Sequence, residues 1–288
     1  MPELPEVETT KEGLKRDLLG QKILKVEISN KKLRFPYDKN FKKRITGEYI
    51  LSITRRAKYI LFTLSNDIKI ISHLGMSGSY RVIDKKLFHN NNKIKHDHFI
   101  FETEKFVVIY NDPRRFGYIL LHNDSTSDHD RLKNLGYEPL SKDCNAKNLS
   151  LLLHNKERNI KNVLMDQRII AGLGNIYVCE ALFKSGISPL LSAKRLVNKD
   201  KTPKKALNFL IKNIKKIIES SIMLGGSSLR DYVNTQGKMG YFQRTFNVYG
   251  REGKECILKD CSSKIRRIVQ SNRSTFFCPS CQKKINIK

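Results

Sequence analysis

Four cysteines near the C-terminus have the spacing that most clearly indicates a chemical role, that of metal ligands. Cys256 and Cys261 are separated by four residues, sixteen residues follow, and Cys278 and Cys281 are separated by two. Four thiolates spaced in this way suit a tetrahedral zinc ion. Buried thiols or disulfides are the other interpretation, which the basic and polar surroundings disfavour. Because protein would fill all four positions around the metal, we predict one structural Zn²⁺ with no position open for a substrate.

Eight further stretches form an ordered set along the chain. They are MPELPEVET (residues 1–9), RRAKY (55–59), HLGMSG (73–78), KHDH (95–98), DPRRFG (112–117), GLGNIY (172–177), GKMGYF (237–242) and NRSTFFC (272–278). In this order, and with the cysteine module at the end, they resemble formamidopyrimidine-DNA glycosylase nearly end to end. The resemblance implies excision of oxidised purines, such as 8-oxoguanine and formamidopyrimidines, from duplex DNA. It also implies cleavage of the abasic strand by β,δ-elimination.

The resemblance assigns the nucleophile to Pro2. Removal of Met1 would expose a secondary amine with a pKa of about 8, below the ~10.4 of a lysine, so part of it is uncharged at neutral pH. Attack on the sugar C1′ displaces the damaged base, and the resulting iminium ion draws electrons from C2′ and permits loss of the 3′ phosphate. Without the other motifs, Pro2 would be interpreted as a processing signal or a helix start.

Three further residues are implied to support this chemistry. Glu3 is expected to protonate the sugar ring oxygen as a general acid. Glu6 is expected to position water or the sugar, and Lys58 to reach the substrate phosphate and assist proton transfer. Each also has an ordinary interpretation, because both glutamates suit the positive end of a helix and an isolated lysine is usually solvated.

Turning a base out of the duplex costs a few kcal/mol and leaves a gap to be filled. Met76, Arg114 and Phe116 match the residues that fill this gap in the family, and Arg114 could also hydrogen-bond the orphaned partner base. From spacing alone, Met76 and Phe116 would be core residues. Their assignment rests on the motifs that flank them.

The resemblance also implies contacts with the DNA backbone. Asn175 is expected to open a helix after a Gly-x-Gly turn, and a helix N-terminus favours phosphate. Lys161 is a further phosphate candidate, and His96 matches a DNA-contacting position. Arg273, near the tip of the zinc hairpin, is expected to hold the phosphates flanking the lesion and to take part in δ-elimination. The loop containing Ser227 and Ser228 is expected to cover the flipped base with its backbone amides.

The chain departs from the family pattern in two places. Cys256 and Cys261 are four residues apart where the family usually has two, which lengthens one zinc knuckle but stays within the range for structural zinc. Glu157 and Arg158 stand where the family tends to have lysine, so one phosphate contact of the family has no matching lysine here. Arg158 is the candidate to make that contact.

The elements that must position these residues follow from periodicity. Pro5 is predicted to open a helix at its first position, with Val7, Leu14 and Leu18 as its apolar stripe. Short β-branched and aromatic runs then predict an antiparallel β-sandwich. The predicted strands are 23–29, 49–55, 59–64, 68–73, 98–102, 106–110 and 118–121.

After about residue 130 the pattern becomes helical. Predicted helices are 146–153, 160–166, 175–185 and 203–224. In the last of these, Thr202 would cap the helix and Pro203 would lie in its first turn. One face of it is apolar: Leu207, Leu210, Ile211, Ile214, Ile217, Ile218 and Ile222. The fold class is therefore α+β and multidomain. With what the resemblance implies, it combines a β-sandwich flanked by helices, a helix-two-turn-helix domain and a C-terminal zinc-finger β-hairpin.

Composition favours a polyanionic partner. Lys and Arg number 55 against 28 Asp and Glu, a net charge of +27 spread along 288 residues. Such an excess favours nucleic acid over an anionic membrane surface. No apolar run approaches the ~18 residues of a membrane span, and the acidic start does not fit a secretory signal. We expect a cytoplasmic, nucleoid-associated monomer that binds double-stranded DNA containing oxidised bases or abasic sites. Cys144 and Cys179 are expected to be plain thiols.

We therefore expect four segments. They are a catalytic sandwich domain (1–130), a helix-two-turn-helix DNA-binding domain (131–225), a lesion-capping loop (226–240) and a zinc-finger domain (241–288). One alternative is an endonuclease VIII-like glycosylase for oxidised pyrimidines. Another is a non-catalytic zinc protein that marks lesions, which the presence of Pro2, Glu3, Lys58 and Arg273 disfavours. An RNA-binding accessory protein would fit the charge but gives no reason for the Met-Pro-Glu start.

Overall fold

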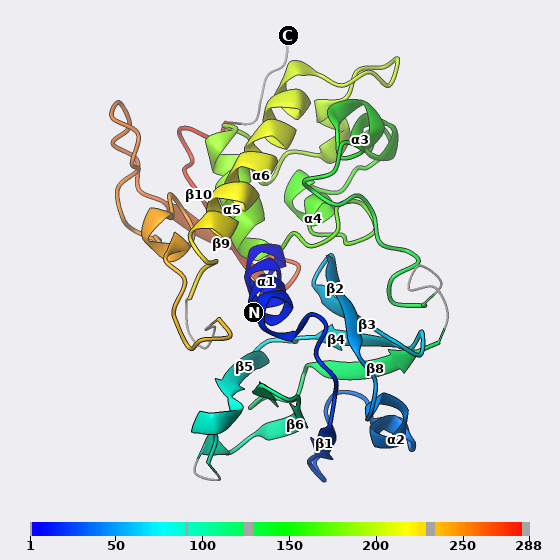
Figure 1. The fold of residues 1–288 in the computed structure, drawn as a ribbon. Coiled ribbons are helices and arrows are strands. Elements are labelled where there is room, and N and C mark those ends of the chain that lie inside the picture. The colour runs from blue at the N-terminus through cyan, green and yellow to red at the C-terminus, as the bar shows by residue number, and fades with distance from the viewer. Residues whose placement is uncertain (1, 90–91, 124–128, 229–233, 284–288) are drawn as a thin grey trace. The chain divides into compact units, whose positions relative to one another are not determined.

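The computed structural model describes residues 2–89, 92–123, 129–228 and 234–283 (Figure 1). The chain divides into two compact units. The sandwich unit comprises Met1–Asn134 and Ile222–Gln243, and the zinc-bearing unit comprises Leu135–Ser221 and Arg244–Lys288. Among the described residues, no helix is long and apolar enough to cross a membrane.

The first helix, α1 (Leu4–Leu18), begins one residue earlier than predicted, because Leu4 rather than Pro5 is its first residue. Pro5 still lies in the first turn, where a missing N–H costs no intrahelical bond. The predicted stripe is confirmed, since Val7, Leu14 and Leu18 are fully buried. Through this stripe α1 packs against the sandwich, chiefly along β2 (Ile50–Arg56).

Two four-stranded antiparallel sheets form the sandwich. One sheet has the order β1-β6-β7-β5, with bounds Lys25–Ile28, Asp97–Glu102, Phe106–Asn111 and Ser79–Asp84. The other has the order β2-β3-β4-β8, in which the bounds of β3, β4 and β8 are Tyr59–Leu64, Lys69–His73 and Tyr118–His122. A short helix, α2 (Phe41–Ile45), closes the core. All seven predicted strands are present, and the antiparallel sandwich is confirmed.

One apolar core joins both sheets and the helices. Its members include Val7, Leu14, Leu18, Phe41, Ile45, Ile53, Ile60, Phe62, Ile70, Phe99, Phe101, Val108 and Ile119. Neither β5 nor α2 was predicted. In β5 only Tyr80 is fully buried, so the strand lacks the apolar run that marks its neighbours. Its place is set by pairing with β7, from Ser79 opposite Asn111 to Asp84 opposite Phe106.

The zinc-bearing unit is helical and ends in a β-hairpin. Its helices are α3 (Ala146–Leu153), α4 (Ile160–Leu164), α5 (Asn175–Lys184) and most of α6 (Lys205–Met223), with a one-turn helix at Ala193–Leu196. The hairpin pairs β9 (Arg266–Gln270) with β10 (Arg273–Phe277). The four predicted helices and the hairpin are therefore confirmed.

The start of α6 differs from the prediction. The helix begins at Lys205, so Pro203 lies before it and Thr202 is not its cap. Pro203 instead forms a β-bridge with Val197, and the Thr202 hydroxyl donates to Asp200 at 2.7 Å. The apolar face is as predicted. Leu207, Leu210, Ile211, Ile214, Ile217 and Ile218 are buried, and Ile222 is half-buried.

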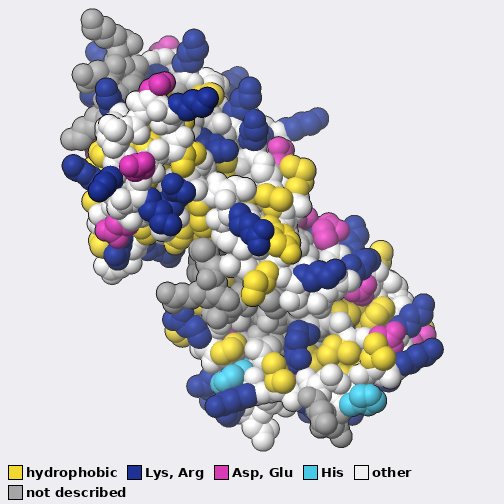
Figure 2. Space-filling view, turned by 90° about the vertical axis from the view of Figure 1, so that its left-hand side faces the viewer, with side chains coloured by type: hydrophobic (Ala, Val, Ile, Leu, Met, Phe, Trp, Pro, Cys, Tyr) yellow, Lys and Arg dark blue, Asp and Glu magenta, His cyan; other side chains and the backbone are white. Residues whose placement is uncertain are grey.

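The surface reflects the composition. Figure 2 shows Lys and Arg side chains spread over the whole of one face, with acidic side chains scattered between them. A net charge of +27 distributed in this way attracts polyanions over a broad area rather than at one tail.

Removal of Leu14 from the core tests whether α1 is held to the sandwich by burial. We expect Leu14→Ala to lower the free energy of unfolding by about 2–5 kcal/mol, because it leaves a cavity beneath the helix. The exposed neighbour provides the control, since Lys15→Ala should change stability by less than about 0.5 kcal/mol. Urea denaturation measures both. Equal effects of the two substitutions would contradict the packing described.

Candidate active site and zinc centre

Pro2 and Glu3 lie at the start of α1. Both are buried, and Glu3, with 3 % of its surface exposed, occupies the N-cap position. Its side chain forms a capping box with that of Glu6: the Glu3 side chain accepts from the backbone N–H of Glu6, and the Glu6 side chain accepts from the backbone N–H of Glu3. The two predicted catalytic residues are therefore adjacent, in a segment whose backbone is fixed by the helix that follows.

The Glu6 carboxylate holds this segment in place. One oxygen accepts from the Glu3 backbone N–H at 2.8 Å. The other accepts from the Ser227 backbone N–H at 2.8 Å and from the Ser227 hydroxyl at 2.9 Å. Glu6 has only 1 % of its surface exposed. A buried carboxylate satisfied in this way fixes the start of α1 against residue 227 of the same unit.

Lys58 lies in the two-residue turn between β2 and β3, preceded by Ala57 in the left-handed region at φ 52°. The prediction that Lys58 follows a strand is confirmed. An ion-pair cluster fixes the hairpin to α1, since Arg55 Nε donates to Glu8 at 2.5 Å and Lys11 Nζ lies 2.6 Å from Glu8. Burial by itself would raise the pKa of Glu8, but hydrogen bonds from Lys11 and Arg55 outweigh it and lower that pKa.

His73, at the end of β4, is neutral at cellular pH. Burial first, and then the positive charges of Lys58, Arg34 and Arg131, lower its pKa to about 3. Its Nδ1 accepts from the Gly75 backbone N–H at 2.9 Å, so the ring proton is on Nε2. This places a neutral hydrogen-bond donor near the charge of Lys58.

Met76, Arg114 and Phe116 are exposed, so the core interpretation of Met76 and Phe116 is excluded. The Arg114 guanidinium lies over the Phe116 ring, 4.9 Å from its centroid. Apolar side chains held at the surface in this way are suited to insertion between stacked bases.

Buried Asp112 fixes the turns that carry these three side chains. It accepts from the Ser77 hydroxyl at 2.6 Å and from the Gly117 N–H at 2.7 Å. Gly117 must be glycine, because a Cβ there would lie 1.8 Å from the Tyr110 hydroxyl. The backbone beneath the exposed side chains is therefore rigid.

His96 lies beside the same turn. Its carbonyl accepts from the Asp112 N–H at 3.1 Å, and its backbone is in the left-handed region at φ 76°. Its half-buried ring lies 6.3 Å from the ring of His98. His98 has a different role. It is buried, with its two nitrogens within hydrogen-bond distance of the Ser29 hydroxyl and the Asp112 carbonyl.

The predicted capping loop is described on both sides of residues 229–233, which lie outside the described residues. Within this loop, the backbone amides of Ser227 and Ser228 already have protein acceptors. Ser227 N–H donates to Glu6, and Ser228 N–H donates to Gln243 Oε1 at 2.9 Å. In this arrangement neither amide is available to a base. Thr235 packs closely on α1, since a Cβ on Gly13 would lie 2.2 Å from its hydroxyl.

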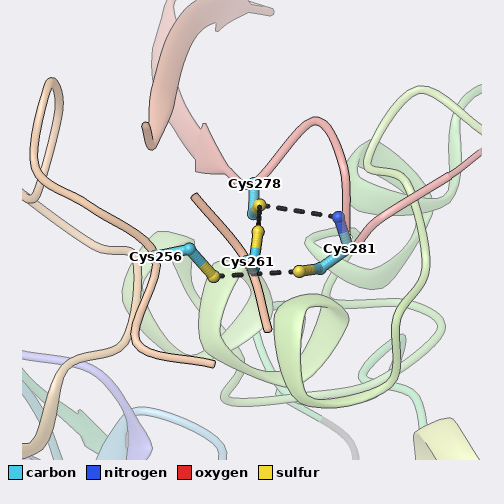
Figure 3. A group of neighbouring side chains, drawn as sticks. All are labelled: Cys256, Cys261, Cys278 and Cys281. Carbon is cyan, nitrogen blue, oxygen red and sulfur yellow. Dashed lines mark hydrogen bonds between the residues drawn. The ribbon is translucent and has the colours of Figure 1, made fainter. Parts of the chain in front are cut away.

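In the zinc-bearing unit the four cysteine side chains point toward one another (Figure 3). The sulfur atoms of Cys256 and Cys281 are 3.8 Å apart, those of Cys261 and Cys278 are 3.6 Å apart, and all four lie within 4.8 Å of one another. Ligands about 2.3 Å from a common centre in tetrahedral geometry lie about 3.8 Å apart. The four cysteines can therefore bind one zinc ion, which confirms the prediction.

The thiols differ in how readily they lose a proton. A hydrogen bond from the Ser263 backbone lowers the pKa of Cys261 to about 7, whereas burial and the neighbouring thiols raise the pKa of Cys281. Zinc binding must therefore release protons and weaken as the pH falls. Cys144 and Cys179 are free thiols, as predicted.

Glu180 of α5 holds the chain that leads into the zinc module. Its carboxylate, with 1 % of its surface exposed, accepts from the backbone N–H groups of Asn247, Val248 and Tyr249 at 2.9–3.1 Å. The Asn247 side-chain amide adds a bond of 2.6 Å. The sequence analysis missed Glu180, although a single acid among the apolar residues of α5 was a usable signal.

Arg273 is the first residue of β10 and is exposed, next to the turn Ser271–Asn272, so its predicted place near the hairpin tip is confirmed. Asn175 opens α5 as predicted, and its side chain donates to the Ser274 carbonyl at 2.7 Å. Arg273 therefore lies on the β9-β10 hairpin, and Asn175 lies on α5, which packs against β10.

Lys161 differs from the expectation of a phosphate ligand. Its side chain is fully buried, and the ammonium donates to the Thr275 hydroxyl at 2.7 Å. It therefore holds β10 rather than pointing to solvent. Arg158 is exposed, and lines a hollow of about 280 Å³ with Arg168, Arg273 and Asp166. That position suits the phosphate contact for which Arg158 was the candidate.

Comparison with known proteins agrees with this geometry. Residues 1–119 match the formamidopyrimidine-DNA glycosylase N-terminal domain, 135–233 match the H2TH domain of the same protein, and 254–284 match a zinc finger found in FPG and IleRS. Formamidopyrimidine-DNA glycosylases of Bartonella tribocorum and Bartonella bacilliformis are 47 % and 48 % identical to the chain. Each alignment covers 98 % of this chain and 100 % of the relative.

Solved structures give the same result. One is a complex of Lactococcus lactis Fpg (MutM) with DNA containing an oxidised pyrimidine, at TM-score 0.85 and 34 % identity. Another is MutM with DNA containing carbocyclic 8-oxo-G, at TM-score 0.85 and 35 % identity. Both alignments cover 98 % of this chain and 100 % of the other. The chain is therefore a glycosylase-type protein with a helix-two-turn-helix domain and a zinc finger. It belongs to the formamidopyrimidine-DNA glycosylase family.

Removal of one zinc ligand tests the metal centre. We expect Cys278→Ser to lose its zinc and to disorder residues 254–283, because the metal contributes on the order of 10 kcal/mol to folding such a module. Cys144→Ala, outside the cluster, should retain one zinc per chain. Metal analysis after dialysis measures both. Retention of stoichiometric zinc by Cys278→Ser would show that the four thiols are not the ligands.

The Glu8 cluster predicts a pH dependence of stability. Because the folded-state pKa of Glu8 lies below its ordinary value of 4.5, the ion pairs stabilise the protein above pH 4.5 and lose their effect as the pH falls through the folded pKa. Glu8→Gln should therefore unfold at a lower temperature than the wild type at pH 7, with the difference shrinking below pH 4.5. Exposed Glu104→Gln is the control. A difference that stays constant from pH 7 to pH 3 would refute the assignment.

Proposed function

We propose that the protein is a base-excision repair enzyme that removes oxidised purines from duplex DNA and cleaves the resulting abasic strand. Family membership over nearly the whole chain supports the class of reaction. The observation that carries the proposal for this chain is the buried Pro2-Glu3 pair at the start of α1, fixed by Glu6.

The proposed chemistry begins once Met1 is removed. The lone pair of the Pro2 nitrogen forms a bond to C1′ as the bond from C1′ to the base breaks, and the base leaves with those electrons. The departing base takes up a proton, and the nitrogen loses its own proton, which restores its lone pair. Glu3 then protonates the ring oxygen as its bond to C1′ breaks and the iminium ion forms. Because the nitrogen is secondary, that iminium ion keeps its positive charge.

The charge on the iminium ion makes the rest of the reaction possible. Loss of a proton from C2′ expels the 3′ phosphate with the electrons of its C3′–O bond, and a second elimination expels the 5′ phosphate. Hydrolysis of the imine releases the enzyme. Lys58 is proposed to bind the substrate phosphate and assist proton transfer, and Arg273 to hold flanking phosphates and support the second elimination.

The remaining residues are proposed to bind DNA. Met76, Arg114 and Phe116 fill the gap left by the flipped base, and their exposure on a rigid turn supports this. His96 and Asn175 contact the backbone. Lys161 is proposed to support binding through β10, since its ammonium is buried there.

The proposal assigns these tasks to segments of the chain. Residues 1–130 would carry catalysis, 131–225 and 241–288 would bind DNA, and 226–240 would cover the lesion. We propose a monomer that works on duplex DNA at the nucleoid.

A nicking panel tests the proposal. The purified protein should nick a duplex carrying 8-oxoguanine opposite cytosine, and borohydride should trap it covalently on that DNA through the iminium ion. Glu3→Gln should slow excision by about 10²–10⁴-fold, because it removes the general acid. Glu12→Gln, on an exposed position of the same helix, should leave the rate within twofold.

Three results would overturn parts of the proposal. Nicking confined to oxidised pyrimidines would assign the chain to endonuclease VIII-like substrates, and the panel includes them because one solved relative holds such DNA. Absence of borohydride trapping would exclude an amine nucleophile. Mass spectrometry showing Met1 still attached in active enzyme would exclude Pro2.

A further inference from the structure

Three aromatic rings form a row across one end of the β2-β3-β4-β8 sheet. Tyr59, His73 and Tyr118 are cross-strand partners on β3, β4 and β8. The rings of His73 and Tyr118 are stacked, with their centroids 5.1 Å apart and an interplanar angle of 10°. The centroid of the Tyr59 ring lies 5.0 Å from that of His73. Lys58 precedes Tyr59 in the turn at this same end. The row therefore extends from Lys58 toward β8.

Arg131 lies at the β8 end of the row. Its guanidinium is 4.2 Å from the ring centroid of Phe35 and 5.1 Å from that of Tyr118, and these two rings meet edge to face at 5.1 Å. Arg34 lies 5.7 Å from the Phe35 centroid. Two flat aromatic faces therefore hold a guanidinium that keeps its five N–H donors at its edge.

Arg131 differs in how it is held from seven other arginines of the chain. Arg16, Arg44, Arg55, Arg81, Arg158, Arg168 and Arg267 each face a carboxylate within 4 Å. Within residues 2–89, 92–123, 129–228 and 234–283, neither Arg34 nor Arg131 forms an ion pair. Stacking fixes the side chain without neutralising it, so its charge is available to an anion.

We propose that Arg131 is a phosphate-binding residue for the DNA strand, held by Phe35 and Tyr118 at the same end of the sheet as Lys58. The inference rests on the proposed function. Two inter-strand spacings of about 4.8 Å place β8 about 10 Å from β3. Each nucleotide of one strand advances the helix axis by ~3.4 Å, so a distance of that size allows Lys58 and Arg131 to bind different phosphates.

The competing explanation is that the stack is only structural and that Arg131 serves to cover Phe35. The two explanations differ in the salt dependence of DNA binding. A phosphate ligand releases a counterion, so its loss lowers the slope of log Kd against log salt by about 0.9. Loss of packing alone changes stability and leaves that slope unchanged.

The test uses the full chain and a duplex with a tetrahydrofuran abasic analogue, which cannot be cleaved through an iminium ion. Between 50 and 200 mM KCl, Arg131→Gln should weaken binding about tenfold at low salt and lower the slope by about one. Lys133→Gln is the matched control, since Lys133 is two residues away, half-exposed and paired with Asp130 at 2.6 Å. It should leave the slope unchanged.

Arg131→Lys keeps the charge but not the flat stacking surface, and it serves as the second variant should Arg131→Gln fail to fold. It should retain the salt slope while losing a fewfold in affinity. A wild-type slope in Arg131→Gln would overturn the inference, as would equal losses in Arg131→Gln and Lys133→Gln. Wild-type affinity in Arg131→Lys would show that the aromatic faces do not position the charge.

Failure of this inference is distinguishable from failure of the proposed function. A wild-type protein that nicks no damaged duplex would refute the proposed function. A wild-type protein that nicks and binds normally, with Arg131→Gln behaving as Lys133→Gln does, would refute only the role of Arg131.

Discussion

The Glu6 carboxylate is the group on which the arrangement of the sandwich unit depends. It accepts hydrogen bonds from the backbone N–H of Glu3 and from the backbone N–H and hydroxyl of Ser227. Because the carboxylate is buried, these protein donors take the place of water. Each such charge-assisted bond contributes about 1.5–3 kcal/mol, whereas an unsatisfied buried carboxylate would cost more than that. The carboxylate is therefore stable only while the start of α1 and residue 227 stay together. Pro2 and Glu3, at the start of α1, are held in place by the same hydrogen bonds.

In the zinc-bearing unit, the buried Glu180 carboxylate likewise fixes a distant segment of the chain through hydrogen bonds. Zinc fixes four sulfur atoms, but the ion exerts no control over how the rest of the module lies on α5. Four donor groups of residues 247–249, which hydrogen-bond to Glu180, supply that control at one end. Buried Lys161 and the Asn175 amide supply it along β10. The direction of Arg273 thus depends on polar groups that are buried and satisfied, not on the metal alone.

Features encoded by residues close together in the sequence could be predicted, whereas features that depend on contacts between distant residues could not. Cysteine spacing located the zinc ligands, and apolar periodicity located α1, α6 and most strands. The strand β5 escaped because its side chains are mostly half-exposed, and its place depends on pairing with β7. The contact of Glu6 with Ser227 joins residues 221 positions apart, and no local pattern encodes it. Pro203 was misplaced because a bridge to Val197, rather than helix propensity, decides its conformation.

The arginines of the sandwich unit are held in two different ways. Arg55 and Arg81 face carboxylates, which neutralise their charges. These ion pairs fix the β2-β3 hairpin and the strand β5. Arg114 and Arg131 lie instead over aromatic rings. An aromatic face attracts a guanidinium and leaves its net charge in place. In a chain with a net charge of +27, the stacked arginines are therefore among the cations whose charge remains for a polyanion.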